Sequence, residues 1–221
     1  ECLAALQNEK VDTRFVKINK GRKTNYHYVL MFGAERTILI KHEAYEYELP
    51  DFDDPGWVYL SSLGENSLPF HKKIAEYLRT HPKVKLAFQP GTYQIKSGRD
   101  ALREIYELSE IFICNKEEAQ RILATNEEDM KKLLALMREA GPKIIAITDG
   151  VNGSYAFDGS DFWQMPMYPD PKPPISRTGA GDAFSSTFTV AIANGLGIET
   201  ALRWGPINSM SVVQQIGARA G

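Results

Sequence analysis

The segment 178–184, TGAGDAF, joins a glycine-rich turn to a carboxylate, and the two could do chemistry together. The apolar residues that follow recur at helical spacing, at Phe184, Phe188, Ala191 and Ile192. This spacing predicts a helix that begins near 179–181, with Asp182 in its first turn. The first amides of a helix have no partner inside the helix, and the helix dipole makes this end partly positive. Glycines there let an anion approach the backbone closely.

An anion site beside Asp182 suits the transfer of a phosphoryl group. The turn would stabilise charge on the transferred group, and Asp182 would accept the proton of an attacking hydroxyl. A short glycine pattern is weak evidence by itself. An ordinary glycine loop, with an aspartate that merely favours the helix dipole, has the same sequence pattern.

A second candidate segment, ICNKEEAQRIL, places Asn115 directly after an apolar run and Glu118 three residues later. One interpretation is structural, because Asn at the N-cap followed by Glu at the third helical position is typical of a capping box. The other is functional, because an amide and a carboxylate at the end of a strand could hold a nucleotide phosphate and a hydrated magnesium ion.

A third segment, ITDGVNG, places Thr148, Gly150 and Gly153 at the end of another apolar run. It fits a glycine turn into a hairpin, or a backbone ledge for a nucleotide. Ligands in open α/β sheets bind outside the carboxyl ends of the strands. All three segments are expected at such ends, or where the sheet leads into a helix.

Strands and helices alternate along the chain, which predicts a mainly parallel sheet covered by helices on both faces. Strands are expected at 56–62, 84–90, 110–115 and 143–150, and a hairpin around Asp158-Gly159 at 153–165. Helices are expected at 69–81, 98–109, 116–123, 127–140, 180–194 and 205–216, with the tail of another at 1–9. A further hairpin at 24–48, with its two strands joined by GAE, interrupts this alternation and is expected to project from the main body.

Together, the ordered motifs TGAGDAF, NKEE at 115–118 and TDGVNG at 148–153 resemble the ribokinase-like (PfkB) family of carbohydrate and nucleoside kinases. The resemblance spans nearly the whole chain. It implies a three-layer α/β/α fold in one domain over 1–221, with the hairpin at 24–48 as a lid.

The resemblance also implies roles for single residues. Asp182 matches the general base, and Gly179, Ala180 and Gly181 match the anion hole. Asn115 and Glu118 match the motif that contacts phosphate and organises Mg²⁺. Thr148 and Gly150, with Gly153 beside them, match the ledge for ATP. Asn208 matches an asparagine near the adenine.

The chain departs from the family pattern at several places. Ser176 and Arg177 stand where Asp-Thr is usual, and Arg177 would contact phosphate or face solvent. Thr187 stands where a small residue packs the helix closely. FQPG at 88–91 replaces Asp-Pro-Asn, which puts the sugar-site inference in doubt at Gln89. The family's N-terminal segment and last elements are not visible, so we expect the chain to be incomplete at both ends.

Composition bounds the partners and the compartment. A formal charge of −2 over 221 residues gives no attraction to nucleic acid or to anionic membranes. No apolar run is long enough to cross a membrane. Two cysteines far apart, Cys2 and Cys114, predict no disulfide framework and fit a reducing cytoplasm.

The favoured hypothesis is an ATP- and Mg²⁺-dependent kinase that phosphorylates a hydroxymethyl group of a sugar or related small molecule. A nucleoside (adenosine-like) acceptor is one alternative, and a degenerate, non-catalytic nucleotide-binding module is another. A nicotinamide-dependent enzyme fits poorly, because its glycine motif follows the first strand. The sequence leaves the acceptor open. The hairpin would touch the substrate or form a homodimer with the hairpin of a second subunit, or its aromatic residues would serve only as strand formers.

Overall fold

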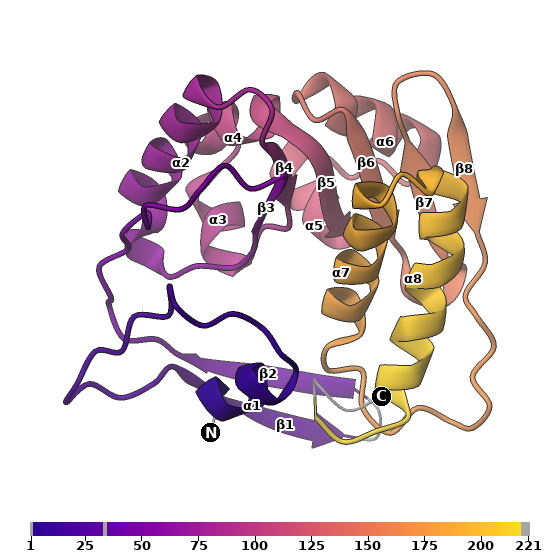
Figure 1. Cartoon of the computed structure of the whole chain (residues 1–221). Coiled ribbons are helices and arrows are strands. Elements are labelled where there is room, and N and C mark those ends of the chain that lie inside the picture. Colours follow the sequence, from indigo (N-terminus) through magenta and orange to yellow (C-terminus); the bar gives the residue numbers. More distant parts are fainter. Residues whose placement is uncertain (1, 33–34, 218–221) are drawn as a thin grey trace.

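A six-stranded sheet organises the chain in the computed structural model, which describes residues 2–32 and 35–217 (Figure 1). Strands lie in the sheet in the order in which they occur along the chain. They are β3 (Trp57–Leu60), β4 (Lys85–Phe88), β5 (Ser109–Asn115), β6 (Ile144–Thr148), β7 (Ser154–Phe157) and β8 (Phe162–Met165). The first four are parallel and the last two add an antiparallel hairpin, so the prediction of a mainly parallel sheet is confirmed.

Helices cover both faces of this sheet (Figure 1). One layer holds α2 (Leu68–Thr80), α3 (Thr92–Ser97), α4 (Arg103–Leu108), α5 (Lys116–Leu123) and α6 (Met130–Glu139). The other layer is the pair α7 (Ala180–Ala193) and α8 (Gly197–Val213), which pack against each other. Helix α1 (Cys2–Asn8) has no buried residue, and short 3₁₀ turns lie at Glu65–Ser67, Asp100–Leu102 and Gly150–Asn152.

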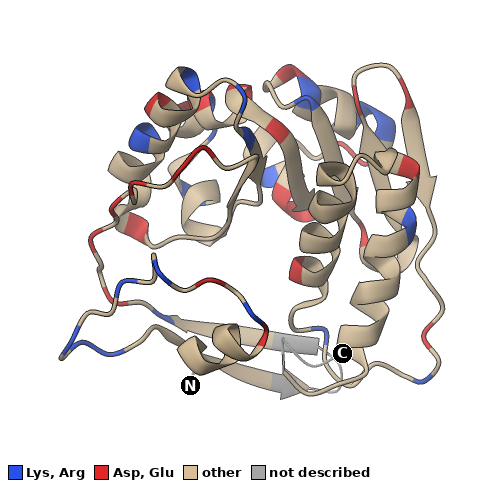
Figure 2. Ribbon diagram, viewed as in Figure 1, with Lys and Arg blue, Asp and Glu red and all other residues tan. Residues whose placement is uncertain are grey.

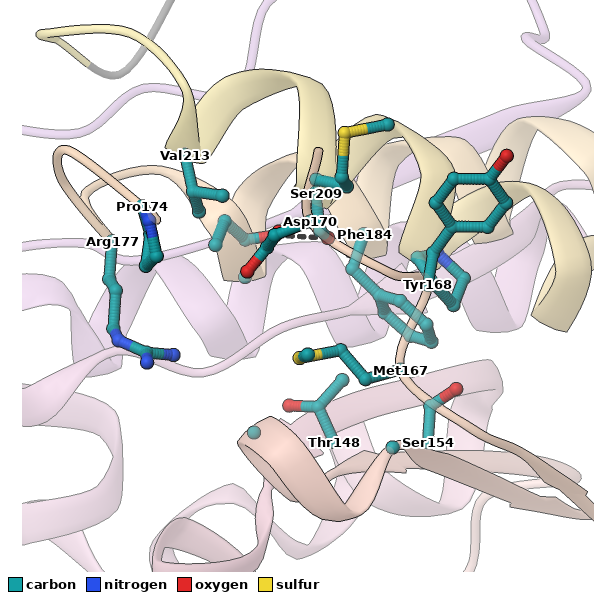
Figure 3. Close-up of a pocket in the computed structure, with 16 residues that line it drawn as sticks. Thr148, Ser154, Met167, Tyr168, Asp170, Pro174, Arg177, Phe184, Ser209 and Val213 are labelled. Atoms are coloured by element: carbon teal, nitrogen blue, oxygen red, sulfur yellow. Dashed lines mark hydrogen bonds between the residues drawn. The ribbon is translucent and has the colours of Figure 1, made fainter. Parts of the chain in front are cut away.

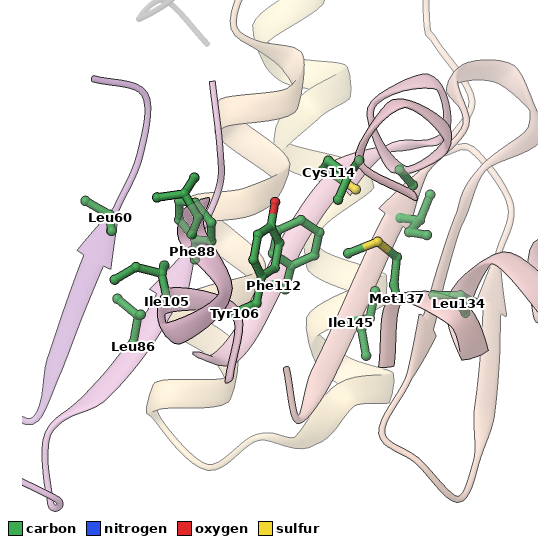
Figure 4. Close-up of a cluster of buried hydrophobic side chains, with 14 of the residues drawn as sticks. Leu60, Leu86, Phe88, Ile105, Tyr106, Phe112, Cys114, Leu134, Met137 and Ile145 are labelled. Atoms are coloured by element: carbon green, nitrogen blue, oxygen red, sulfur yellow. The ribbon is translucent and has the colours of Figure 1, made fainter. Parts of the chain in front are cut away.

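Two hydrophobic cores lie on the two faces of the sheet, because neighbouring residues of a strand point to opposite sides. Phe112 and Cys114 of β5 belong to the core under α2–α6, while Ile111 and Ile113 belong to the core under α7 and α8. In the first core, the rings of Phe88, Tyr106 and Phe112 meet at centroid distances of 5.3–5.8 Å (Figure 4). These cores fix the strand ends that carry the predicted motifs.

The second sheet is the antiparallel hairpin of β1 (Tyr26–Phe32) and β2 (Glu35–Lys41). It lies beyond the carboxyl ends of the parallel strands, near the start of α7 (Figure 1). Of its expected connection GAE, residues 33 and 34 lie outside the described residues. Apolar side chains are exposed on both faces of the hairpin: Tyr28 is 62% and Leu30 58% exposed on one face, and Ile40 is 42% exposed on the other.

The hairpin is shorter than expected, because residues 42–48 form no strand. Side chains instead tie this segment to its neighbours. Asn25 Oδ1 accepts a hydrogen bond from the amide of Glu43, and the Tyr45 hydroxyl donates to the carbonyl of Lys23. The Tyr47 hydroxyl accepts from the amide of Gly64, at 2.8 Å, and so joins the hairpin to the main body.

Helix boundaries differ from the prediction at three places. Helix α8 begins at Gly197 rather than near 205, and it runs through Pro206. Gly205 explains the continuous helix: a Cβ there would lie 2.6 Å from the Phe184 ring, so α7 and α8 pack closely enough to hold a helix that proline weakens.

In place of the expected helix at 98–109, the structure has a 3₁₀ turn at Asp100–Leu102 and then α4, and α3, which precedes them, was not predicted. Gly98 ends α3 with φ +81°, a conformation that favours glycine. Similarly, α6 begins at Met130 rather than at 127, because the Asp129 side chain accepts hydrogen bonds from the amides of Lys131 and Lys132.

Charged side chains of both signs are interspersed on the outer helices (Figure 2). Both cysteines are free, Cys114 in the core and Cys2 at the surface, as expected. Within residues 2–32 and 35–217, no helix is long and apolar enough to cross a membrane.

Candidate active site

Helix α7 begins as the glycine motif predicts. Gly179 is its N-cap residue, with φ +87°, and no side chain caps the helix there. The Ala183 amide bonds to the Gly179 carbonyl, at 2.8 Å, and the Ala180 amide to the Arg177 carbonyl, at 3.4 Å, so the amides left for a ligand are those of Gly179, Gly181 and Asp182. Asp182 lies in the first turn and is exposed. The turn therefore presents backbone donors beside a carboxylate.

A cavity of about 150 Å³ opens on one side of this turn (Figure 3). Its lining brings together two of the predicted segments. Thr148, Gly150 and Gly153 come from the segment after β6, and Ala180 and Gly181 come from the turn at the start of α7. The remaining lining residues come from the link 166–177 and from α7 and α8: Met167, Tyr168, Asp170, Pro174, Arg177, Phe184, Pro206, Ser209, Met210 and Val213, with Ser154 of β7. The cavity is mainly apolar, and polar backbone lies at one end.

The turn after β6 depends on glycine. Gly153 has φ +95°, and a Cβ there would lie 2.2 Å from the Met165 carbonyl oxygen. The backbone of the turn can therefore lie directly against the start of the 166–177 link. This contact gives the cavity a fixed wall at Thr148 and Gly150.

Asn115 and Glu118 form the predicted capping box at the start of α5. Asn115 Oδ1 accepts from the Glu118 amide at 2.8 Å, and Glu118 Oε2 accepts from the Asn115 amide at 2.9 Å. Burial raises the pKa of Glu118, and the charge of Asp182 adds a smaller effect in the same direction. The motif thus forms the capping box of the structural interpretation. Because the box uses Glu118 Oε2, the other oxygen, Oε1, is left for another partner.

The sheet places this capping box beside the nucleotide ledge. Strands β5 and β6 are parallel neighbours, and Asn115 is directly opposite Thr148 in the register. Ala180 and Gly181 at the start of α7 line the same cavity as Thr148. The three predicted segments therefore meet at one edge of the sheet.

Sequence reasoning missed a polar contact on the other side of the turn. Gln89, directly after β4, donates from Nε2 to Asp182 Oδ1 at 3.1 Å, and the Tyr59 hydroxyl of β3 donates to Gln89 Oε1. Burial around its hydroxyl and the charge of Asp182 raise the pKa of Tyr59 to about 12, although 41% of the residue is exposed. Gln89 was noted only as a departure from a pattern. The one signal for Tyr59 was its position in an apolar strand.

Asn208 is not among the described residues that line the cavity. It lies on α8 and donates to the Thr187 hydroxyl at 2.8 Å. Thr187, which replaces the small residue expected there, thus has a partner on the neighbouring helix. Ser209, the next residue, does line the cavity and donates to the Ala180 carbonyl at 2.8 Å (Figure 3). The role of Asn208 near an adenine stays a prediction.

The hairpin of β1 and β2 reaches the same edge of the sheet through two histidines. His27 and His42 lie with their Nε2 atoms 3.0 Å apart, and the His42 ring packs against Tyr93 of α3 at 5.3 Å. Burial and the neighbouring His27 lower the pKa of His42. No group of three or more His, Cys, Asp or Glu side chains within the described part of the chain is arranged to hold a metal ion.

Comparison with known proteins gives a consistent result. The family model described as pfkB family carbohydrate kinase matches residues 1–221. A protein of Archaeoglobus fulgidus named an uncharacterized sugar kinase is 26% identical over 229 residues, which cover 99% of this chain and 88% of that protein.

Two solved structures are similar to the chain. A Burkholderia thailandensis nucleoside kinase in complex with inosine has a TM-score of 0.79 at 15% identity, and the match covers 99% of this chain and 72% of the kinase chain. A Vibrio cholerae fructokinase with fructose, ADP and calcium ion bound has a TM-score of 0.78 at 17% identity, with 98% and 75% covered. At these identities the similarity shows the fold.

Proposed function

The chain belongs to the pfkB family of carbohydrate kinases, and from this premise we propose that it transfers the γ-phosphoryl group of ATP to a hydroxymethyl group of a sugar or related small molecule. One observation carries the proposal: α7 begins without a side-chain cap, at a turn that has a cavity on one side and the Asp182 carboxylate beside it. A carboxylate next to free amides suits the attack of a hydroxyl on a phosphoryl group.

ATP would occupy the cavity. Thr148, Gly150 and Gly153 would form its ledge, and the apolar wall at Phe184 would face the base. Gly179, Ala180 and Gly181 would form the anion hole, since the dipole of a 14-residue helix adds to their amides. Arg177 also lines the cavity, where its positive charge would favour the phosphates.

Asp182 would act as the general base. Its carboxylate takes the proton from the acceptor hydroxyl while that oxygen forms a bond to the γ-phosphorus. The bond from the γ-phosphorus to the bridging oxygen breaks, and ADP leaves with the electron pair. The amides of the turn stabilise the charge on the phosphoryl oxygens during this transfer.

Glu118 fits a magnesium site with few protein ligands. Mg²⁺ bound with ATP is usually held by one or two carboxylates together with phosphates and water. Glu118 Oε1 is free of the capping box, and the raised pKa of this carboxyl indicates a place where a cation would be favourable. When bound there, Mg²⁺ would neutralise charge on the phosphates, and Asn115 would contact them.

The acceptor and the role of the hairpin stay proposals. A nucleoside acceptor is the alternative that belongs in the same test, since a structurally similar protein is a nucleoside kinase. The exposed apolar side chains on both faces of the hairpin support a lid that closes over the acceptor, or that forms a homodimer with a second copy. A cytoplasmic location stays a prediction.

Release of ADP from ATP and Mg²⁺, measured across pentoses, hexoses, sugar acids and nucleosides, tests the proposal. We expect one acceptor to stimulate release, and Asp182→Asn to lower that turnover by about 10²–10⁴-fold while ATP still binds. Full turnover in Asp182→Asn would overturn the mechanism. ATP binding without stimulation by any acceptor would favour a nucleotide-binding module.

A further inference from the structure

Asp182 is joined to the main body by a chain of two side chains from two strands. Gln89 follows β4 and donates to Asp182 Oδ1 at 3.1 Å. Tyr59, on the neighbouring strand β3, donates to the other end of the same amide, Gln89 Oε1. The residues that face Asp182 are thus Tyr59 from β3, Gln89 from the turn after β4 and Glu118 from α5.

Tyr59 fixes which way the amide of Gln89 points. The phenol keeps its proton at neutral pH, as an ordinary tyrosine does, and burial and the charge of Asp182 raise its pKa further, to about 12. A protonated phenol that donates to Oε1 leaves Nε2 toward Asp182. The reversed amide would set its oxygen against a carboxylate oxygen, which is unfavourable for two acceptors.

This arrangement also fixes the carboxylate. The bond from Gln89 takes up one acceptor site of Oδ1, so Oδ2 is the more open of the two oxygens for taking a proton. An amide gains and loses no proton in the neutral range, and hydrogen bonds to a carboxylate favour its charged form. A base on the exposed first turn of a helix would otherwise lose rotamer freedom only when substrate binds.

We propose that Gln89 is a positioning residue for Asp182 and that Tyr59 is the anchor of Gln89. The inference rests on the proposed kinase function, because it assigns the orientation of the base in that reaction. Gln89 acts through Asp182 rather than on the phosphoryl group.

The test substitutes the amide by its isosteric acid. Gln89→Glu places a second carboxylate about 3 Å from Asp182, and like charges at that distance disfavour ionisation of the pair. We expect the acid limb of the kcat/KM profile to move to higher pH by on the order of one unit, which is about a tenfold loss at a pH on that limb. Activity should recover at alkaline pH. Tyr59→Phe should change the profile in the same direction by less.

The chain offers a matched control. Gln164 of β8 donates to the Tyr155 hydroxyl at 3.3 Å, on the antiparallel edge of the sheet. Gln164→Glu makes the same chemical change next to a tyrosine, and it should leave the pH profile unchanged. A loss of activity in Gln89→Glu that is equal at every pH would show a structural effect alone and overturn the inference.

A second measurement separates this inference from the kinase proposal. The titration of the Asp182 carboxyl can be followed by carbon NMR, with Asp182→Asn to assign the signal. Its midpoint should rise in Gln89→Glu whether or not an acceptor is found. An unchanged midpoint overturns the inference even in an active kinase. A raised midpoint without turnover upholds the pairing and refutes the proposed function.

Discussion

Helices α5 and α7 both begin at the carboxyl edge of the sheet, but they satisfy their first amides differently. At α5, Asn115 and Glu118 bond each other's backbone amides, at 2.8 and 2.9 Å. At α7, the N-cap residue is Gly179, which has no side chain to offer. The start of α5 is capped by side chains in the free protein, whereas the start of α7 leaves amides for a ligand.

The capped start of α5 contributes to the stability of the fold, whereas the uncapped start of α7 serves the proposed reaction. A capping side chain contributes about 1 kcal/mol to a helix. Helix α7 forgoes this contribution and instead is held from its sides, by Phe184 and Phe188 in the core. Substitutions at the two helix starts should therefore move stability and activity in different proportions.

The largest effect is expected at the open turn, from Gly181→Ala. Gly181 lines the cavity, and a Cβ added to it would meet nothing within 4 Å, so alanine should raise the free energy of unfolding by about 0.5 kcal/mol. The methyl group would obstruct the approach of a phosphate to the amides, and we expect kcat/KM to fall by about 10²-fold.

Gly56→Ala is the control for Gly181→Ala, because Gly56 is equally unobstructed and lies before β3, away from the turn. Denaturant unfolding and ADP release measure the two effects. Unchanged kcat/KM in Gly181→Ala would mean that no phosphate approaches this turn, and the contrast between the two helix starts would lose its functional meaning.

The next effect is expected from Glu118→Gln at the capped helix. Glutamine can accept the same bond from the Asn115 amide, and it removes a carboxyl whose pKa burial raises. The free energy of unfolding at pH 7 should therefore stay the same or rise by up to about 1 kcal/mol.

If Glu118 also holds Mg²⁺, the concentration of Mg²⁺ needed for half-maximal turnover should rise by about 10–100-fold in Glu118→Gln. Glu117→Gln, at the exposed neighbour, should leave it unchanged. An unaltered Mg²⁺ dependence would restrict Glu118 to capping.

The smallest effect is expected from Asn115→Ala, which removes the cap of α5. It should lower the free energy of unfolding by about 1 kcal/mol. Asp129→Ala removes the cap of α6, away from the cavity, and should cost about the same. A larger loss of turnover in Asn115→Ala than in Asp129→Ala would indicate contact with phosphate, and equal losses would leave only the capping role.

Local signals in the sequence predicted much of this arrangement. The capping box placed the start of α5 correctly, and Asp158-Gly159 predicted the hairpin of β7 and β8. At α7, the glycine motif and the apolar spacing together predicted the start of the helix. Each of these signals lies within a few residues of the feature that it predicts.

What could not be predicted depends on contacts between distant residues. Gln89 and Asp182 are separated by 93 positions, and only the order of strands brings them together. The early start of α8 depends on the approach of Gly205 to Phe184, whereas the sequence signal at Pro206 favoured a later start. The bond of Asn208 to Thr187 depends on the rotation of α8 against α7.

Asn115 and Thr148 lie directly opposite each other on β5 and β6, and this pairing decides where residues can be inserted without separating the two motifs. The two residues meet through the register of parallel strands, so insertions in the connection between α5 and α6 would leave them opposed. A slip of one residue in β6 would instead move Ile145 and Ile147 to the face now occupied by Ala146. The packing of both cores thus preserves the alignment of the two motifs when the loops around them vary.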